Sequence, residues 1–192
     1  MQIGQVFDEI QEAYTKKMIR WVPHYLDLIK MLDTSFPKQW HPESILDLGA
    51  GNGNITASLI KHYPDATYTL LDASAKMLEE AKSRFPETKV FYQQDLIQNA
   101  QFTSGTFSLV TASFSLHHLS LSDKENTIKS IHKWLSPGGY FAYIDLFISK
   151  KDIEHAPFMA SWQNFVMQEG DSEDWEYLAN HYQEYDKPDN LL

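Results

Sequence analysis

Apolar side chains recur at helical spacing over the first part of the chain. They repeat every four positions from Val6 to Met18, and the acidic and amide side chains at positions 8, 9, 11 and 12 face elsewhere. Pro23 interrupts this run, and a second apolar stripe follows it. The pattern predicts two helices, roughly over residues 4–20 and 22–33, before a proline-containing loop.

From Ser44 the pattern changes to short apolar runs that alternate with helical stretches. The predicted strands cover residues 45–48, 67–71, 89–92, 107–113 and 140–147. The predicted helices between them cover residues 55–62, 75–85 and 124–135. This alternation requires right-handed βαβ crossovers, and runs that are apolar on both faces indicate a sheet covered on both sides. We therefore predict a doubly wound α/β fold with a mainly parallel, Rossmann-like sheet.

The length and the remaining pattern predict a single domain with three parts. Residues 1–40 form an N-terminal helical cap, residues 44–148 the α/β core, and residues 149–192 a helical segment rich in aromatic residues. The aromatic side chains of the last part favour a packing face or a lid over a cofactor-binding box.

Composition and charge exclude several functions. The formal net charge of −10 offers no electrostatic footprint for nucleic acid or for an anionic membrane. The absence of cysteine excludes disulfides, thiolate zinc sites and cysteine nucleophiles. The N-terminus lacks the basic and apolar regions of a signal peptide, and no apolar stretch approaches 18 residues. We expect a soluble cytoplasmic protein.

A glycine-rich turn, Asp47-Leu48-Gly49-Ala50-Gly51-Asn52-Gly53-Asn54, connects the first core strand to its helix. Glycine lets a ligand approach the backbone closely, and the amides at the helix N-terminus face that ligand. Dinucleotides and S-adenosylmethionine both use such a turn, but the dinucleotide fingerprint G-x-G-x-x-G needs one more residue than this spacing provides. A tight connection without any ligand is the structural alternative.

Acidic residues stand at the ends of the first three core strands. Asp72 closes the second strand, 19 residues after Gly53, where a carboxylate can accept hydrogen bonds from both ribose hydroxyls. Asp95 follows the third strand and is placed to accept from an adenine amino group. With Asp47, these side chains meet at the carboxyl edge of the sheet, where open α/β sheets bind ligands. Alternatively, Asp72 caps the helix that begins near Ala75, and Asp95 is an ordinary loop carboxylate.

Taken together, these motifs resemble those of class I S-adenosylmethionine-dependent methyltransferases of the small-molecule type. ILDLGAGNGNIT resembles the first motif of that family, LLDAS with Met77 the second, YQQDL the third, VTASFSLHHL the fourth, and LSPGGYF the turn before strand five. VFDEIQEAYTKK resembles the family's N-terminal opening, with Thr15 where aspartate is commoner. The resemblance covers residues 5 to about 148.

The resemblance implies a strand order of 3-2-1-4-5. It also implies a departure, because the chain ends before the antiparallel hairpin of strands six and seven that full-length members carry. We therefore expect a truncated form in which the edge of strand five is covered by the C-terminal segment or by a second protomer in a homodimer.

The resemblance further implies S-adenosylmethionine as the cofactor, bound along the carboxyl edge of the sheet. The implied cofactor-binding residues are Tyr14, Asp47, Gly49, Ala50, Gly51, Asn52, Asp72, Ala73, Met77, Asp95, Leu96, Ser113 and Phe114. In this assignment Asp47 and the turn backbone hold the amino acid end, and Asp72 holds the ribose. Ala73 and Met77 flank the adenine, and the Asp95 side chain and the Leu96 amide lie at its polar edge. Ser113 and Phe114 lie beside the methionine portion, and Tyr14 covers the site.

Methyl transfer is an in-line displacement, so positioning and exclusion of water matter more than a catalytic triad or a metal. His118 and Tyr14 are the candidate catalytic residues if the acceptor must lose a proton, although Tyr14 also suits the helix core. We expect the adjacent His117 and His118 to diverge, which predicts no metal site. The acceptor is expected over strands four and five, walled by the N-terminal helices and the segment after Ser149.

Two other functions remain compatible with these residues. One is a cofactor-binding regulatory or interaction protein without catalytic activity. The other is an NAD-dependent oxidoreductase, which the glycine spacing and the acidic strand ends disfavour. For the methyltransferase, the expected partner is a small-molecule methyl acceptor.

Overall fold

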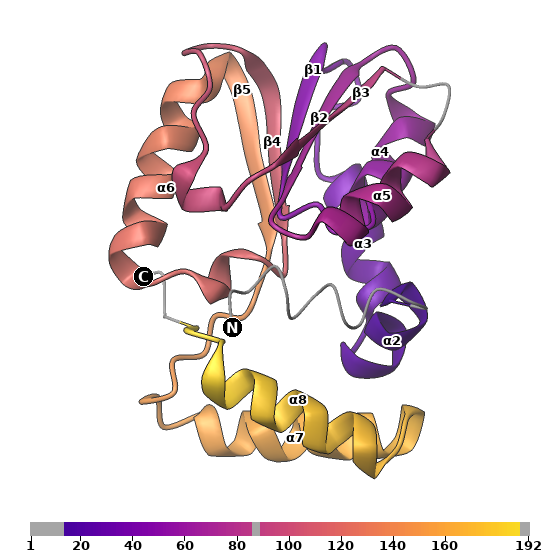
Figure 1. Ribbon diagram of the computed structural model, residues 1–192, viewed down its shortest axis with the longest axis vertical. Coiled ribbons are helices and arrows are strands. Elements are labelled where there is room, and N and C mark those ends of the chain that lie inside the picture. Colours follow the sequence, from indigo (N-terminus) through magenta and orange to yellow (C-terminus); the bar gives the residue numbers. More distant parts are fainter. Residues whose placement is uncertain (1–13, 86–88, 189–192) are drawn as a thin grey trace.

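The computed structural model describes residues 14–85 and 89–188, and within them a five-stranded parallel sheet forms the centre of the molecule (Figure 1). The strands are β1 (Ser44–Leu48), β2 (Thr67–Asp72), β3 (Val90–Gln94), β4 (Phe107–Ser113) and β5 (Leu135–Ile144). Their order is β3-β2-β1-β4-β5, and every neighbouring pair is parallel. The predicted doubly wound fold and its strand order are confirmed.

Helices cover both faces of this sheet (Figure 1). One face carries α3 (Tyr25–Thr34), α4 (Asn54–His62) and α5 (Ala75–Arg84), and the other carries α6 (Leu121–Trp134). Two single 3-10 turns, η1 (Ile97–Asn99) and η2 (Leu116–His118), follow β3 and β4. This arrangement leaves the loops at the carboxyl ends of the strands to form one edge of the molecule.

Alternation along the strands divides the core into two layers. Ile45 and Leu70 are fully buried against α3, α4 and α5. Leu46 and Leu71, their neighbours in sequence, are fully buried on the opposite side with the apolar stripe of α6. A strand buried on both faces explains why the sequence shows continuous apolar runs here and not a clean alternation.

Two element boundaries differ from the predicted ones for identifiable reasons. Helix α6 begins at Leu121 and not at 124, because the Ser120 hydroxyl caps the helix by accepting a hydrogen bond from the Asp123 amide. Strand β5 begins at Leu135, since this residue pairs with Phe107 before an irregularity in the register. Of the predicted helix over 4–20, residues 4–13 lie outside the described residues, and the described part is α2 (Tyr14–Trp21).

Helices α7 (His155–Glu169) and α8 (Ser172–Glu184) lie across the carboxyl end of the sheet, below it in Figure 1. They pack against α2: the Trp21 indole donates to Asp174 at 2.8 Å, and the Trp162 indole donates to the Trp21 carbonyl at 2.6 Å. The C-terminal segment therefore closes over the strand ends, and these two helices do not run along the outer edge of β5.

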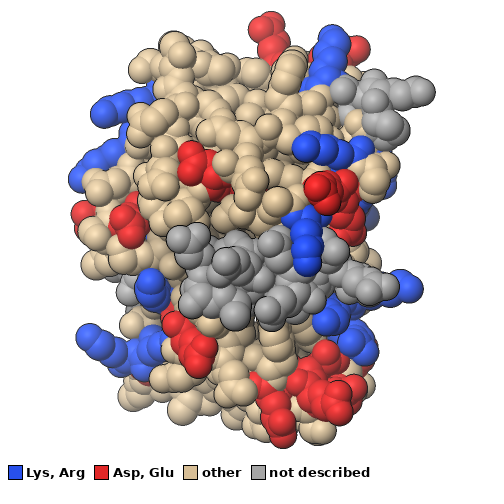
Figure 2. Space-filling view, viewed as in Figure 1, with Lys and Arg blue, Asp and Glu red and all other residues tan. Residues whose placement is uncertain are grey.

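Most of the face seen in Figure 2 is uncharged, and basic and acidic side chains of both signs are scattered over it, many of them near its rim. Acidic side chains gather at the lower end of this face, over α7 and α8. None of the helices among the described residues combines the length and the apolar character that a membrane span needs.

Candidate functional site

The glycine-rich turn after β1 has a backbone that only glycine adopts easily. Gly49 and Gly53 have φ angles of +68° and +80°, in the left-handed region. A Cβ atom on Gly49 would lie 2.3 Å from the Ser115 Cβ atom, so a larger residue cannot fit there. The amides of Gly49 and Ala50 both donate to the Leu71 carbonyl, at 2.8 and 3.0 Å. Strand β2 thus fixes the turn against the sheet edge.

Asp72, at the end of β2, also holds this turn. Its Oδ2 atom accepts from the Gly51 amide at 2.7 Å, and its Oδ1 atom accepts from the Ser74 amide at 2.8 Å. The cap of α5 is Ser74, whose hydroxyl accepts from the Met77 amide. Asp72 is therefore not the side-chain cap of α5, which removes one alternative role for it.

A cleft of about 590 Å³ opens at this edge of the sheet. Its lining residues are Tyr14, Gly49, Gly51, Asp72, Ala73, Met77, Leu96, Ile97, Gln98, Ser113, Phe114, Ser115, His118 and Leu119. The structure thus brings together nine residues of the predicted cofactor site and the candidate base His118. Four lining residues were not predicted from the sequence. Ile97 and Gln98 directly follow the third motif, and Ser115 and Leu119 lie within the fourth.

Four predicted residues lie outside this lining. Asp47, Ala50 and Asn52 line a smaller hollow beside Gly49 and Gly51. Asp95 lines neither space, and its Oδ1 atom accepts from the Leu96 amide at 2.8 Å. The two groups predicted for the polar edge of adenine therefore bond to each other in this structure.

Asp47 is a buried carboxyl with two hydroxyl donors. Thr56 donates to Oδ2 at 2.8 Å and Thr111 donates to Oδ1 at 3.0 Å. Burial raises the pKa of Asp47 from 3.8 to about 6, although the hydrogen bonds from the two threonines act in the opposite direction. A positive ligand group nearby would favour its ionised form.

Asn52 joins the turn to two helices. Its amide nitrogen donates to Glu80 of α5 at 2.9 Å and to the Thr15 hydroxyl of α2 at 3.1 Å. Thr15 in turn donates to Asn54 at 2.9 Å, at the start of α4. The threonine that departs from the family's usual aspartate therefore ties α2 to the glycine turn.

A second cavity lies next to the cleft, between the sheet edge and the helices α2, α7 and α8. It is lined by Tyr14, Met18, Trp21, Val22, Phe114, His117, Trp162, Tyr177, Leu178, His181 and Asp186. Tyr14 and Phe114 line both spaces and form the wall between them. Phe114 has a φ of +51°, an uncommon conformation for a bulky residue. Backbone strain of this kind concentrates at functional sites.

Tyr14 is not merely a residue of the helix core, because it faces both cavities. Burial raises its pKa well above 10, and the nearby Tyr25 and Asp72 raise it further. At neutral pH the phenol is therefore protonated, which suits a hydrogen-bond donor and not a general base.

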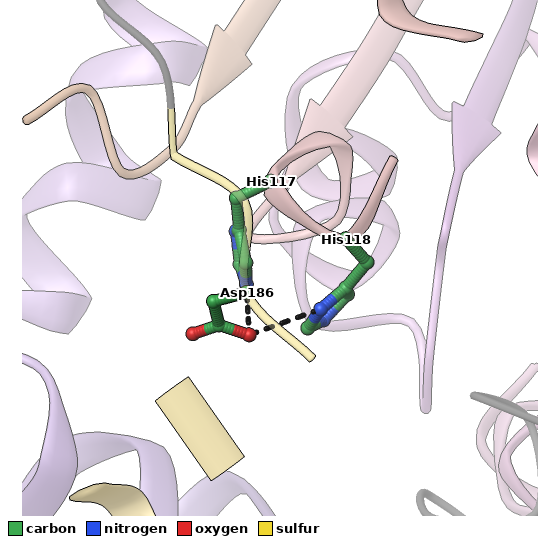
Figure 3. Close-up of side chains that lie close together, drawn as sticks. All are labelled: His117, His118 and Asp186. Carbon is green, nitrogen blue, oxygen red and sulfur yellow. Dashed lines mark ion pairs between the residues drawn. The ribbon is translucent and has the colours of Figure 1, made fainter. Parts of the chain in front are cut away.

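The expectation that His117 and His118 diverge is wrong. Both lie in the short turn η2, and their ring centroids are 4.1 Å apart. Both point toward Asp186, which follows α8 (Figure 3). A ligand atom from each of the three residues lies within 4.8 Å of the other two. The tight 3-10 turn and the returning C-terminal segment produce a convergence that adjacency in the sequence argues against.

Two carboxylates set the state of these histidines. Burial alone would lower the pKa of His117, but the Asp145 carboxylate bonded to its Nδ1 atom raises it above 6.5. Burial, followed by repulsion from His117, lowers the pKa of His118 to about 4. His118 is thus neutral at pH 7 but a weak base. Asp145 directly follows β5, so its place after a strand was a usable signal, whereas Asp186 has no local signal.

The sequence of the core matches known methyltransferases. Residues 45–139 match the family described as "Methyltransferase domain". An uncharacterised methyltransferase of Synechocystis is 38% identical over 104 residues, which cover 54% of this chain and 47% of that protein. A demethylmenaquinone methyltransferase of Chlamydia trachomatis is 31% identical over 102 residues, covering 53% and 44%. The matched segments span about half the length of these curated relatives.

A solved S-adenosylmethionine-dependent methyltransferase from Mesorhizobium loti shares the architecture. Its TM-score is 0.54 at 26% identity, with 65% of this chain and 54% of that chain covered. The sheet order, the glycine turn and the acidic end of β2 agree with these similarities. Residues 45–139 thus form a methyltransferase domain, and these similarities identify class I S-adenosylmethionine-dependent methyltransferases as its family and S-adenosylmethionine as its cofactor.

Proposed function

We propose that this chain binds S-adenosylmethionine in the cleft and transfers its methyl group to a small molecule in the adjoining apolar cavity. The observation that carries the proposal is the shared wall of the two spaces, formed by Tyr14 and Phe114. Because the two spaces share these residues they lie side by side, and an opening between Tyr14 and Phe114 would let the acceptor atom reach the methyl carbon in line with the departing sulfur.

The residues of the cleft fit the cofactor chemically. Asp72 offers a carboxylate to ribose hydroxyls, and Met77, Leu96 and Ile97 provide apolar walls for the flat adenine. A Cβ atom on Gly51 would occupy the space between the turn and Tyr14, whose Cε1 atom would lie 3.9 Å from it. The glycine turn therefore leaves room for a ligand against the backbone.

For the amino acid end we propose Asp47 with the backbone of Gly49, Ala50 and Gly51. Asp47 lines the hollow next to the cleft, so its carboxylate is close enough to attract the ammonium group directly or through water. Ser113 and Phe114 would lie beside the methionine portion. Asn52 serves this site by holding the turn to α2 and α5.

At the adenine end we propose that the Asp95 side chain and the Leu96 amide exchange their mutual hydrogen bond for bonds to the ring. Such an exchange needs only a rotation of the Asp95 side chain, because Leu96 already lines the cleft. Asp95 is thus proposed as a residue that enters the site when the cofactor binds.

The acceptor cavity favours a small molecule with an apolar body. Its walls are mainly aromatic and aliphatic, with Trp21, Trp162 and Tyr177 contributing the largest side chains. His117, His181 and Asp186 provide a polar end. The similarity to a protein named demethylmenaquinone methyltransferase supports a small-molecule acceptor as well.

In the mechanism, S-adenosylmethionine supplies a methyl group on a positively charged sulfur. The chain supplies position and shelter: Tyr14 and Phe114 border the place where the two spaces adjoin and would orient the acceptor atom toward the methyl group. The helices α2, α7 and α8 exclude water from the acceptor side. Neutral His118, which lines the cleft, can accept a hydrogen bond from an acceptor group but removes a proton only weakly.

We further propose that the helical cap, the core and the C-terminal helices work as one methyltransferase unit, since α2, α7 and α8 complete the acceptor cavity.

Strand β5 is the last strand at its side of the sheet, and edge strands can pair with a second copy. Light scattering that shows a monomer at high protein concentration would contradict a homodimer through β5.

Methyl transfer is tested with methyl-labelled S-adenosylmethionine and a protein-free cell extract as the source of acceptors. We expect a labelled small molecule that forms with the wild-type chain and not with Gly49→Ala. Cofactor binding without any labelled product would contradict the proposed reaction and favour a non-catalytic binding protein.

A further inference from the structure

Three side chains where the polar end of the acceptor cavity meets the cofactor cleft form a cluster that methyl transfer itself does not require. His117 and His118 come from η2, and Asp186 comes from the segment that follows α8 (Figure 3). The side chains of His117, His118 and Asp186 are 7%, 10% and 5% exposed, so the cluster is shielded from bulk water. We propose that these three residues bind a divalent metal ion of the zinc class.

The distances fit a tetrahedral ion. The Oδ1 atom of Asp186 lies 3.6 Å from His117 Nε2 and 3.1 Å from His118 Nδ1. Two ligands each about 2.0–2.1 Å from a tetrahedral zinc lie roughly 3.3–3.4 Å apart. Both distances lie within about 0.3 Å of that spacing, and all three ligand atoms lie within 4.8 Å of one another, so adjustment of the side chains can bring them around one ion.

The ligand set fits the same chemistry. Two imidazoles and one carboxylate are a common set for zinc sites that keep an open position and for related divalent metals. The Nε2 atom of His181 lies 3.4 Å from the same Asp186 oxygen. Among the described residues, however, only His117, His118 and Asp186 place their ligand atoms within 4.8 Å of one another. The structure thus supplies three ligands and one open position.

Asp145 orients one of these ligands from behind. Its Oδ1 atom bonds to Nδ1 of His117, which leaves Nε2 directed at the cluster. The other oxygen of Asp145 accepts from the amides of Leu116 and His117, at 2.9 and 3.1 Å. A carboxylate that fixes the ring and the tautomer of a histidine ligand is typical of metal sites.

Asp186 is held in place by the backbone next to it. The Lys187 amide donates to the His117 carbonyl at 2.6 Å, and the Lys124 ammonium donates to the Lys187 carbonyl. The C-terminal segment is thus attached to η2 through the Lys187 amide and to α6 through the Lys187 carbonyl. This attachment sets the position of the carboxylate before any ion binds, which lowers the cost of ordering it.

The position of the cluster links it to the reaction. His118 lines the cofactor cleft, while His117 and Asp186 line the acceptor cavity. An ion between them lies at the junction of the two spaces, where its open position can take an acceptor oxygen. This role in orienting the acceptor rests on the proposed function, whereas metal binding by the three residues does not.

The test is calorimetric titration of ZnCl₂ into the full chain, without an affinity tag and after removal of metals by a chelator. We expect one zinc per chain. Asp186→Asn and His118→Gln are each expected to lower the affinity at least about tenfold, since even the orienting residues of metal sites contribute this much. His132→Ala, which changes an exposed histidine in the last turn of α6, is the matched control and is expected to bind as the wild type does.

Absence of stoichiometric zinc binding by the wild type would overturn the proposal, and so would equal losses in Asp186→Asn and His132→Ala. If circular dichroism shows that a variant is not folded, the visible absorption of Co²⁺ added to the wild type tests the site instead. The visible absorption of four-coordinate Co²⁺ is expected, and the spectrum of the hydrated ion would refute the site. A parallel titration with S-adenosylmethionine separates the hypotheses, because zinc binding without cofactor binding would contradict only the proposed function.

Discussion

The two ends of the site are built in different ways. On the β1–β2 side, a contiguous turn of eight residues and the next strand end form the cofactor cleft through backbone conformation. On the β4–β5 side, the acceptor cavity and its histidine cluster are assembled from α2, η2, α7, α8 and the segment at Asp186. One added Cβ atom can disrupt the β1–β2 side, whereas the β4–β5 side depends on packing between segments that are far apart in the sequence.

The largest expected effect is on the glycine side. In Gly49→Ala the added Cβ atom meets the Ser115 side chain at 2.3 Å in a left-handed backbone. We expect a loss of several kcal/mol in the free energy of unfolding and loss of cofactor binding, from overpacking and strain together. Thermal unfolding measures the loss of stability, and calorimetric titration measures the loss of S-adenosylmethionine binding.

Gly105→Ala is the matched control, because Gly105 also has a positive φ of +71° but no neighbouring atom lies within 4 Å of the place that a Cβ atom would take. It should lose only about 1–2 kcal/mol, the cost of the left-handed backbone. Equal losses in the two variants would show that close packing at Gly49 is unimportant.

The second effect concerns the buried carboxyl of Asp47. Its folded-state pKa of about 6 lies above the ordinary value of 3.8, so the folded protein holds a proton that the unfolded chain releases between these values. The stability from this group is fully present below pH 3.8 and is lost as the pH rises through 6, by roughly 3 kcal/mol in total. Asp47→Asn lacks this dependence.

Urea unfolding of the wild type and Asp47→Asn from pH 4 to pH 7 measures this effect as a difference. The stability of the variant relative to the wild type should rise by that amount across the range. A difference that stays constant with pH would contradict the raised pKa of Asp47.

The third effect separates two roles of Asp72, its hydrogen bonds to the glycine turn and its proposed binding of the ribose. In Asp72→Asn one oxygen still accepts from the Gly51 amide, but the charge that strengthens hydrogen bonds from the ribose is gone. We expect about 1.5–3 kcal/mol weaker cofactor binding and a smaller loss of about 0.5–1.5 kcal/mol in the free energy of unfolding, because the amide nitrogen cannot accept the bond from Ser74. Asp65→Asn, at an exposed position before β2, is the control. A large loss of stability without a loss of affinity would make Asp72 purely structural.

The smallest effect is expected for Tyr14→Phe, at the wall between the two sides. Since the phenol stays protonated at neutral pH, its removal deletes a hydrogen-bonding group and not a base. Cofactor affinity should fall by about 0.5–1.5 kcal/mol, and the pH profile of methyl transfer should keep its shape. A profile in which the rise of the rate with pH disappears in Tyr14→Phe would restore Tyr14 as the general base.

The difference between the two sides also explains what the sequence could predict. The glycine turn and Asp72 are local in sequence, so their place at the carboxyl edge of the sheet was predictable, while their roles toward the cofactor stay a prediction. The sheet order was expected from the family resemblance and is confirmed. Asp95 was placed correctly after β3, but its bond to the Leu96 amide depends on a side-chain rotamer that no pattern encodes.

The histidine cluster was not predictable in this way. The spacing rule for metal ligands on a regular helix does not apply to a 3-10 turn, where His117 and His118 converge. Asp186 reaches them only because α7 and α8 fold back over the sheet edge and Lys187 bonds to the His117 carbonyl. Such a site depends on tertiary packing, which periodicity and motif spacing do not describe.

Calorimetric titration of S-adenosylmethionine into the well-folded chain tests the central claim most directly. The structure predicts one cofactor per chain, no comparable binding of NAD, and loss of the signal in Gly49→Ala but not in Gly105→Ala. Absence of S-adenosylmethionine binding by the folded wild type, or tighter binding of NAD, would contradict the assignment of the cleft.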